Sequence, residues 1–288
     1  MTGIDVQELN NFIDLAIYED VRDGDHTSLA CIPSDARSRA KLLVKEQGVL
    51  AGVELAEHIF RRMDGNVLFE KKISDGAPIN FGDIAFEVEC DSQTLLKAER
   101  LVLNLMQRMG GIATLSRQYQ QAVADLPVTI LDTRKTTPLL RFLEKWAVKI
   151  GGCSNYRYGL YDRIMLKDNH IDACGTITKA VEKVTIYKQA KSLQHLPVTV
   201  EVRNLAELRE TISVGTGGKV NRIMLDNFEL SMMHEAVKII DKAFETEASG
   251  GVNLQTLRNI ALTGVDFISV GALTHSARSM DLSLKIIK

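Results

Sequence analysis

Basic and acidic residues in this chain gather where short apolar runs end, and together they have the residue types of a site for a polyanion. Arg134 and Lys135 follow one run, and Lys167 follows another. Arginine holds carboxylates and phosphates through paired hydrogen bonds, while lysine pairs with an anion or forms a Schiff base. Glu201 and Asp226 end two further runs, and such carboxylates suit ribose hydroxyls or a hydrated Mg²⁺. These residues predict a polyanionic substrate that carries a phosphate.

A predicted helix start and three loops add to this prediction. Thr137 and Pro138 follow the first basic pair and predict the start of a helix, because threonine caps helices and proline fits their first turn. Free N–H groups at that helix start would bind an anion. Residues 249–251 and 271–272 form two glycine-containing loops, and late barrel strands hold phosphates through the backbone N–H groups of such loops. Arg157 lies in a third loop, which is rich in small residues.

Each of these assignments has a structural alternative. The basic loops would carry ordinary surface charge, and the glycine turns would need no ligand. Lys167 would form an ion pair with Asp168 at the rim, and the two carboxylates would cap the helices that follow them. His170 and His275 would be bases or hydrogen-bond donors, although a lone histidine is more often structural. The sequence signatures of P-loop enzymes, zincins and α/β-hydrolases are absent from the chain.

The apolar runs alternate with helix-length amphipathic segments, which predicts parallel βαβ units. The runs are short and rich in β-branched residues, and their charged ends would meet at one mouth if the strands close into a barrel. The predicted strands end at residues 131, 166, 200, 225, 244 and 270, and the predicted helices include 139–150, 177–193, 205–214 and 254–262.

The first part of the chain has a different, mixed α+β pattern. The predicted elements are helices over residues 6–20 and 51–63 and strands over 40–44 and 84–88. A further helix begins near Leu95 and runs to the Gly110–Gly111 pair, after which helical character resumes. Residues 281–287 partly alternate, which predicts a strand that returns to this part. We therefore predict a sandwich domain over 1–115, rejoined by 276–288, and a barrel domain over 116–275.

The bulk composition is that of an ordinary globular protein, with 45% hydrophobic and 25% charged residues among 288. The formal net charge is −2, so no basic field favours nucleic acid or an anionic membrane as a partner. The four cysteines have no CxxC spacing, which predicts reduced thiols in a cytoplasmic protein. No apolar run approaches the roughly 20 residues that span a bilayer.

The ordered set of motifs resembles the quinolinate phosphoribosyltransferases, also called nicotinate-nucleotide pyrophosphorylases (carboxylating). The resemblance covers nearly the whole chain. In the barrel part it rests on residues 131–138, on Gly151 and Gly152 with Asn155 and Arg157, and on 167–170, 200–203, 225–227, 248–251, 268–271 and 274–275. In the first part it rests on residues 19–20, 24–25, 27–28, 99–104 and 111–114.

This resemblance implies an α/β protein with an amino-terminal α+β sandwich domain and an open or incomplete α/β barrel of about six parallel strands. It also implies a homodimer with shared active sites, in which Arg100 of one subunit reaches the site of the other. The implied reaction takes quinolinate and phosphoribosyl pyrophosphate to nicotinate mononucleotide, pyrophosphate and CO₂ with Mg²⁺, in de novo NAD biosynthesis.

The resemblance further assigns roles to residues of this chain. The anionic groups of both substrates would be held by Arg100, Arg134, Lys135, Arg157 and Lys167. Lys135 and Arg157 would flank the carboxylate that is lost, while Glu201 and Asp226 would hold the ribose hydroxyls and Mg²⁺-bound water. The remaining implied substrate contacts are Thr133, Ser249, Gly250, Gly251, Val270, Gly271, Ala272 and His275, those at 249–251 and 270–272 through the backbone.

Two residues depart from the pattern of the family. Tyr156 stands where the family commonly has histidine, and its phenol is neutral at pH 7 but can donate a hydrogen bond. Cys153 stands in place of a glycine, so this position does not need the backbone freedom of glycine. Tyr156 keeps open a relative of the same fold with another pyridine substrate, such as nicotinate. A Schiff-base aldolase that uses Lys167 is a second possibility, against which the surplus of arginine counts, and a non-catalytic phosphate-binding regulator is a third.

Overall fold

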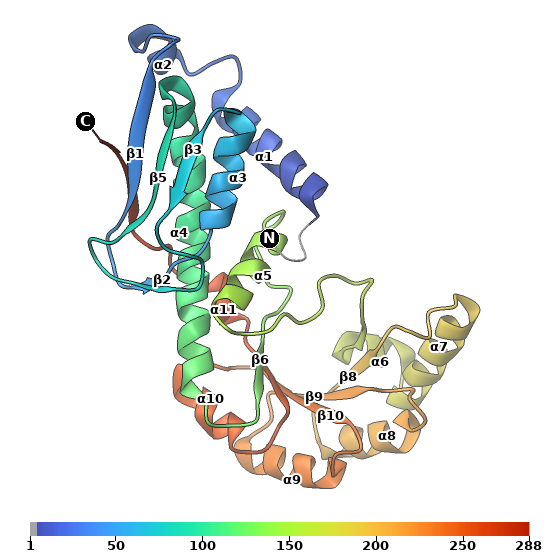
Figure 1. The fold of residues 1–288 in the computed structure, drawn as a ribbon. Coiled ribbons are helices and arrows are strands. Elements are labelled where there is room, and N and C mark those ends of the chain that lie inside the picture. The colour runs from blue at the N-terminus through green and yellow to red at the C-terminus, as the bar shows by residue number, and fades with distance from the viewer. Residues whose placement is uncertain (1–4, 288) are drawn as a thin grey trace. The chain divides into compact units, whose positions relative to one another are not determined.

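The computed structural model describes residues 5–287 (Figure 1), and its contacts divide the chain into two compact units. Of the described residues, unit 1 contains 5–117, 142–152 and 277–287, and unit 2 contains 118–141 and 153–276. The sequence prediction kept residues 142–152 in the barrel domain, whereas the contacts assign them to unit 1. Residues 1–4 and 288 of the predicted first domain lie outside the described residues.

Unit 1 is built on a four-stranded antiparallel sheet in the order β12–β1–β5–β3. Along β1, alternate residues such as Ala40, Leu42 and Val44 are buried, which is the period of a sheet with one covered face. β12 pairs with β1 and is the returning strand that the pattern of residues 281–287 predicts. The elements are α1 (Val6–Val21), α2 (His26–Cys31), β1 (Arg37–Val44), β2 (Gly48–Val49), α3 (Val53–Met63), β3 (Leu68–Lys71), β4 (Pro78–Ile79), β5 (Ile84–Asp91) and β12 (Leu282–Ile287).

Helix α5 (Arg141–Ile150) packs within unit 1, although the chain reaches it directly from a barrel strand. The ring of Phe142 meets that of Phe12 edge to face, with 5.4 Å between their centroids. Glu144 is 1% exposed and accepts a hydrogen bond of 2.9 Å from Arg108. An amphipathic pattern shows that a helix has one covered face, but it does not say which surface covers that face.

Helix α4 (Ser92–Ala122) is continuous through Gly110 and Gly111, so the predicted interruption at this pair is wrong (Figure 1). The two glycines instead permit a close approach by the segment that precedes β12. A Cβ atom on Gly111 would lie 1.8 Å from the carbonyl oxygen of Arg278, and one on Gly110 would lie 3.1 Å from the sulfur of Met280. Only a residue without a side chain leaves room for that backbone.

We predict that Gly111→Ala lowers the free energy of unfolding by about 1–3 kcal/mol, because the added methyl group must displace the backbone at Arg278. Denaturant unfolding measures this change. Gly65→Ala is the matched control, because nothing lies within 4 Å of its Cβ position, and it should change stability by less than about 0.5 kcal/mol. A Gly111→Ala protein as stable as the control would contradict the steric explanation.

Unit 2 contains a six-stranded parallel sheet in the order β6–β11–β10–β9–β8–β7. This is the order of a barrel opened between β6 and β7, so the prediction of an open α/β barrel of about six parallel strands is confirmed. Figure 1 shows α8, α9 and α10 along one side of the sheet. The strands are β6 (Thr129–Leu131), β7 (Ile164–Leu166), β8 (Val198–Val202), β9 (Arg222–Asp226), β10 (Glu245–Ser249) and β11 (Phe267–Ser269). The helices are α6 (Asp168–Cys174), α7 (Ile177–Ala190), α8 (Leu205–Gly215), α9 (Leu230–Ile240), α10 (Leu254–Ala261) and α11 (Ala272–His275).

Two strands differ from their predicted bounds because each includes a buried glutamate. β10 begins after the apolar run that was predicted to form it, and it contains Glu247, which has no exposed surface. The Glu247 carboxylate accepts hydrogen bonds from Arg222 Nη1 at 3.0 Å and from Ser269 Oγ at 2.5 Å. β8 likewise continues past residue 200, so Glu201 lies within the strand. A charge interrupts the apolar pattern, and partners on neighbouring strands make its burial possible.

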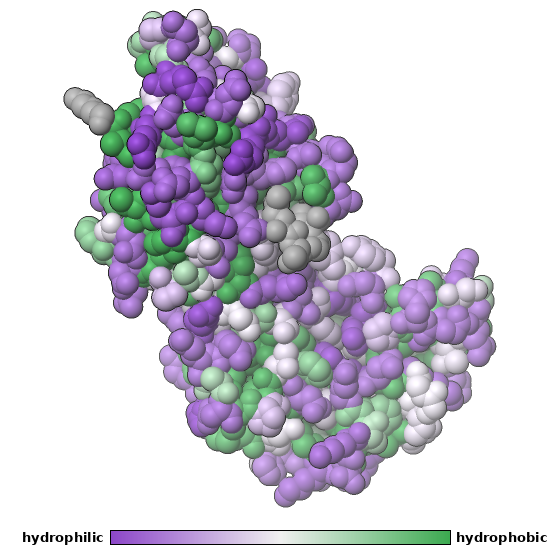
Figure 2. Space-filling view, in the orientation of Figure 1, coloured by the Kyte–Doolittle hydropathy of each residue, from purple (hydrophilic) through white to green (hydrophobic). Residues whose placement is uncertain are grey.

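No helix in the described part of the chain is both long and apolar enough to cross a membrane. Hydrophilic side chains cover much of the visible face in Figure 2, with smaller hydrophobic areas between them.

Candidate active site

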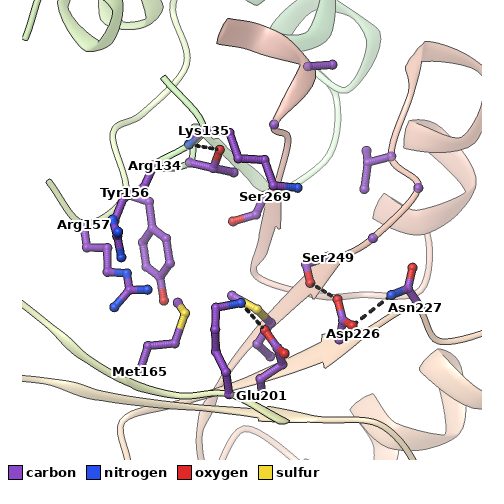
Figure 3. A pocket seen from close by; sticks show the side chains of 18 of the residues that line it. Arg134, Lys135, Tyr156, Arg157, Met165, Glu201, Asp226, Asn227, Ser249 and Ser269 are labelled. Carbon is purple, nitrogen blue, oxygen red and sulfur yellow. Dashed lines mark hydrogen bonds and ion pairs between the residues drawn. The ribbon is translucent and has the colours of Figure 1, made fainter. Parts of the chain in front are cut away.

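A cavity of about 600 Å³ lies at the carboxyl ends of the parallel strands of unit 2 (Figure 3). Most residues that the sequence predicted for the site line this cavity. They are Thr133, Arg134, Lys135, Arg157, Lys167, Glu201, Asp226, Ser249, Gly250, Gly251, Gly271, Ala272 and His275. Val270 is not among them, and its N–H donates to the carbonyl oxygen of Leu131 at 2.8 Å. Arg100 lies exposed on α4 in unit 1.

Arg134, Lys135 and Arg157 are three cations around the cavity that form no ion pair within the described residues. The Nε atom of Arg134 is buried and has no hydrogen-bond partner there. Burial lowers the pKa of the Arg157 guanidinium, and the positive charge of Arg134 lowers it further. Partly buried cations without counter-charges are costly, so this side of the cavity favours binding of an anion.

The predicted helix start at Thr137 and Pro138 is wrong, because α5 begins only at Arg141. Leu139, which lies between Pro138 and Arg141, has a φ of 65°, in the left-handed region that interrupts a helix. Arg134 and Lys135 therefore act from a loop, and their charges favour an anion without the help of a helix dipole at this point.

Lys167 pairs with Glu201 and not with Asp168, which was its predicted structural partner. The Lys167 Nζ atom lies 2.8 Å from Oε2 of Glu201, whose side chain is 7% exposed. In a Schiff-base aldolase the lysine Nζ must be placed to attack a carbonyl carbon, whereas the Nζ of Lys167 is engaged by Glu201. His170 accepts a hydrogen bond at Nδ1 from the backbone N–H of Lys167 and is exposed, so its role is to cap α6.

The carboxylates of Glu201 and Asp226 are not helix caps, which was their structural alternative. The residues at the caps of α8 and α9 are Asn204 and Glu229. Asp226 Oδ1 accepts a hydrogen bond of 2.7 Å from Ser249 Oγ, and Oδ2 accepts one of 2.8 Å from Asn227 (Figure 3). Both carboxylates are therefore held in place at the cavity with lone pairs left to accept further hydrogen bonds.

The donor set fits a hydrated Mg²⁺ and does not fit a metal ion held by protein groups alone. Within residues 5–287 no group of three or more His, Cys, Asp or Glu is placed to hold a metal. Two carboxylates, Glu201 and Asp226, line the cavity. Mg²⁺ keeps several waters and is commonly bound through one or two carboxylates together with substrate phosphates.

Residues of the loops after β10 and β11 line the cavity and have backbone N–H groups available to a ligand. Gly250 and Gly251 have φ values of 93° and 61°, which favour glycine, and a Cβ on Gly250 would lie 2.1 Å from Asn227 Oδ1. Within the described residues, the N–H groups of Gly250, Gly251, Gly271 and Ala272 have no acceptor. Consecutive free amides of this kind form an anion-binding concavity.

Six further residues line the cavity that the sequence prediction did not assign to the site. A signal for three of them was present, because strand residues two apart face the same side of a sheet. Met165, Met224 and Ser269 lie two residues before Lys167, Asp226 and Gly271. The other three are Tyr156, Asn227 and Val252.

Tyr156 is held at both its backbone and its side chain. Its N–H donates to Asp132 Oδ1 at 2.8 Å, and its hydroxyl lies 2.9 Å from Thr199 Oγ1. The guanidinium groups of Arg163 and Arg222 lie 5.3 and 5.2 Å from the centre of its ring. Burial raises the pKa of Tyr156 to about 12, and the negative charge of Glu247 adds to the effect.

We predict that the phenol of Tyr156 stays protonated where an exposed tyrosine, with a pKa near 10, is already half ionised. Because folding raises this pKa to about 12, Tyr156 contributes stability that is complete below the unfolded pKa and is lost as the pH rises through the folded one. An ultraviolet difference titration of the wild type against Tyr156→Phe measures the ionisation. A tyrosinate signal from Tyr156 at about pH 10 would contradict the prediction.

An open α/β barrel whose strand ends carry cations, carboxylates and glycine loops around one cavity defines an enzyme that binds a phosphorylated substrate. The chain matches the quinolinate phosphoribosyl transferase N-terminal domain over residues 25–110 and its C-terminal domain over 112–285. It belongs to the quinolinate phosphoribosyltransferase family.

Named relatives match along almost the full chain. The quinolinate phosphoribosyltransferase [decarboxylating] 1b of Nicotiana tabacum is 46% identical over 97% of this chain and 82% of its own. The probable nicotinate-nucleotide pyrophosphorylase [carboxylating] of Bacillus subtilis is 39% identical over 97% of this chain and 93% of its own. The crystal structure of NadC from Streptococcus pyogenes has a TM-score of 0.91, with 35% identity and coverage of 100% of both chains.

Proposed function

We propose that this protein transfers the phosphoribosyl group of phosphoribosyl pyrophosphate to quinolinate, with loss of CO₂, to give nicotinate mononucleotide and pyrophosphate in de novo NAD biosynthesis. The observation that carries the proposal is the charge arrangement of the cavity. Cations without ion pairs, two fixed carboxylates and free glycine amides line one space of about 600 Å³. A dicarboxylate and a sugar phosphate together require these three kinds of partner. Membership of the family supports the same reaction.

The residues divide by the group that each would hold. Arg134, Lys135, Arg157 and Lys167 would bind the carboxylates of quinolinate and the phosphates of the donor, because arginine pairs with such groups through two hydrogen bonds. Glu201 and Asp226 would accept hydrogen bonds from the ribose hydroxyls. The amides of the loops after β10 and β11 would bind the 5′-phosphate. His275, which lines the cavity beside Gly271, would contact the same phosphate.

The reaction needs no protein nucleophile. The pyridine nitrogen forms a bond to the anomeric carbon of ribose while the bond from that carbon to pyrophosphate breaks, and pyrophosphate leaves with the electron pair. Fixed charges around both substrates lower the barrier by holding them in line and by stabilising the charge that develops. The ring then carries a positive nitrogen. When the 2-carboxylate leaves as CO₂, the electron pair of the broken bond stays on the ring carbon, where the adjacent positive nitrogen stabilises it, and that carbon then takes up a proton from water. Lys135 and Arg157 would flank that carboxylate.

We also propose that Mg²⁺ is required. When bound with the donor, it would neutralise the pyrophosphate and so make it a better leaving group. Glu201 and Asp226 would hold this ion through water, since both line the cavity and both keep lone pairs free.

A homodimer with shared sites is part of the same proposal, with Arg100 of each subunit contributing to the cavity of the other. Large apolar side chains that are more than half exposed support an association surface. In unit 1 they include Tyr18, Leu29 and Phe81, and in unit 2 they include Leu139, Leu160 and Tyr161. We place the protein in the cytoplasm, because its four cysteines are free thiols, and cell fractionation tests this location.

We predict that the purified protein forms nicotinate mononucleotide from quinolinate and phosphoribosyl pyrophosphate with Mg²⁺, and that chelation of Mg²⁺ abolishes the activity. Arg157→Met should lower kcat/KM about 100-fold or more, because a buried substrate carboxylate would lose its partner. Arg209→Met on α8 is the matched control, because this arginine is 62% exposed and has only a distant ion pair. Product from nicotinate in place of quinolinate would instead support a relative with another pyridine substrate.

Shared sites predict complementation between two inactive variants. Arg100→Ala removes the side chain that a subunit contributes to the site of its partner. Glu201→Gln inactivates the site within the same subunit. Co-expression should restore about a quarter of wild-type activity, because half of the dimers are mixed and each mixed dimer has one intact site of two. Activity no greater than the sum of the two variants alone would contradict a shared site.

A further inference from the structure

Tyr156 lines the cavity, but the groups that hold its side chain in place lie deeper in the protein, behind the cavity. Its ring stands among the pocket side chains in Figure 3. Its hydroxyl lies 2.9 Å from Oγ1 of Thr199, which is fully buried near the start of β8. Arg163 donates to the same Oγ1 at 3.2 Å, so the phenol and a guanidinium share one buried hydroxyl. The ring is therefore held at a fixed depth.

The second guanidinium beside the ring is that of the buried Arg222, which belongs to a network on β9, β10 and β11. Arg222 donates to Glu247 at 3.0 Å and to Glu245 at 2.8 Å, and it lies 3.6 Å from the ring centre of Phe267. With three such partners the Arg222 side chain has no freedom to follow a moving ring. The Tyr156 ring thus contacts a guanidinium group that is itself held in place. A desolvated guanidinium attracts the face of an aromatic ring beside it.

The backbone of the same residue is tied to a different strand end. The N–H of Tyr156 donates to Asp132, which has no exposed surface and directly follows β6. The backbone N–H and the ring together therefore fix Tyr156, the residue that precedes Arg157. Arg157 itself forms no ion pair in the described residues, so its neighbours in the chain place it. Tyr156 precedes it, and Tyr158 follows it with an N–H that donates to Asp162 at 2.6 Å.

We infer that Tyr156 is a positioning residue for Arg157, acting through its ring contacts and without proton transfer, and that it thereby sets the affinity for the pyridine dicarboxylate. The inference rests on the proposed function for the identity of that anion. A neutral phenol cannot act as a base at pH 7, whereas its ring can restrain its neighbour at any pH at which the protein is folded. The hydroxyl contributes the hydrogen bond with Thr199, and the ring contributes the contacts with both guanidinium groups.

Three substitutions separate these contributions, assayed as kcat and as KM for quinolinate. Tyr156→Leu removes the ring and should raise KM about tenfold or more, with a change in kcat of less than about threefold. Tyr156→Phe keeps the ring and should raise KM by less than about threefold, with the pH profile of kcat/KM unaltered. Tyr156→His should add an ionisation near pH 6–7 to that profile, since imidazole titrates there. Tyr187→Leu on α7 is the control, because that ring is exposed and does not line the cavity.

A loss of kcat in Tyr156→Phe as large as in Tyr156→Leu would overturn the inference, because the hydroxyl would then take part in the chemistry. An unchanged KM in Tyr156→Leu would overturn it as well. Amide hydrogen exchange over residues 153–158 gives a readout that does not depend on turnover, and it should be faster in Tyr156→Leu than in Tyr156→Phe. If the wild type fails to turn over quinolinate, the proposed function falls, and the exchange result alone decides whether Tyr156 positions the segment.

Discussion

The parallel register of six strands is the constraint on which the site depends. Leu166 pairs with Val200, so the next residues, Lys167 and Glu201, stand side by side and form their ion pair. Asp226 pairs with Ser249 in the same way, and the hydrogen bond between their side chains follows from that register. A shift of one residue would turn each of these side chains to the opposite face of the sheet. The chemistry at the strand ends is thus a consequence of the backbone pairing at, or one residue before, the side chains that form it.

Charge is distributed unevenly within the cavity, and this unevenness suits two anionic substrates. The carboxylates are already engaged by a lysine, a serine and an asparagine, whereas the guanidinium groups of Arg134 and Arg157 form no ion pair in the described residues. Leaving such cations unpaired costs stability in the free protein. A bound dianion would remove that cost, which is the usual sense in which a preorganised site stores binding energy for its ligand.

Behind the cavity lies a layer of buried polar side chains that includes Arg222 and Glu247. Apolar side chains of similar volume would cost less free energy to bury there. The Arg222–Glu247 pair is almost fully buried, and desolvation of each ion costs on the order of several kcal/mol. Such a layer does fix geometry, because charged and hydrogen-bonded groups have few competing partners in a low-dielectric interior. Tyr156 takes its position from this layer, so the stability lost there is linked to the placement of the pocket side chains.

The sequence by itself determined the alternation of strands and helices, the residues at the strand ends and, through ordered motifs, the family. These are local properties, since apolar periodicity and motif spacing can be read within one segment. Tertiary structure decided that helix α4 continues through Gly110 and Gly111 and that α5 packs in unit 1. It also decided that β10 contains Glu247 and that Lys167 forms its ion pair with Glu201 rather than with Asp168. Each of these depends on a partner from a distant part of the chain, as Gly111 depends on Arg278. A pattern in one segment carries no information about that partner, so only the folded chain could settle it.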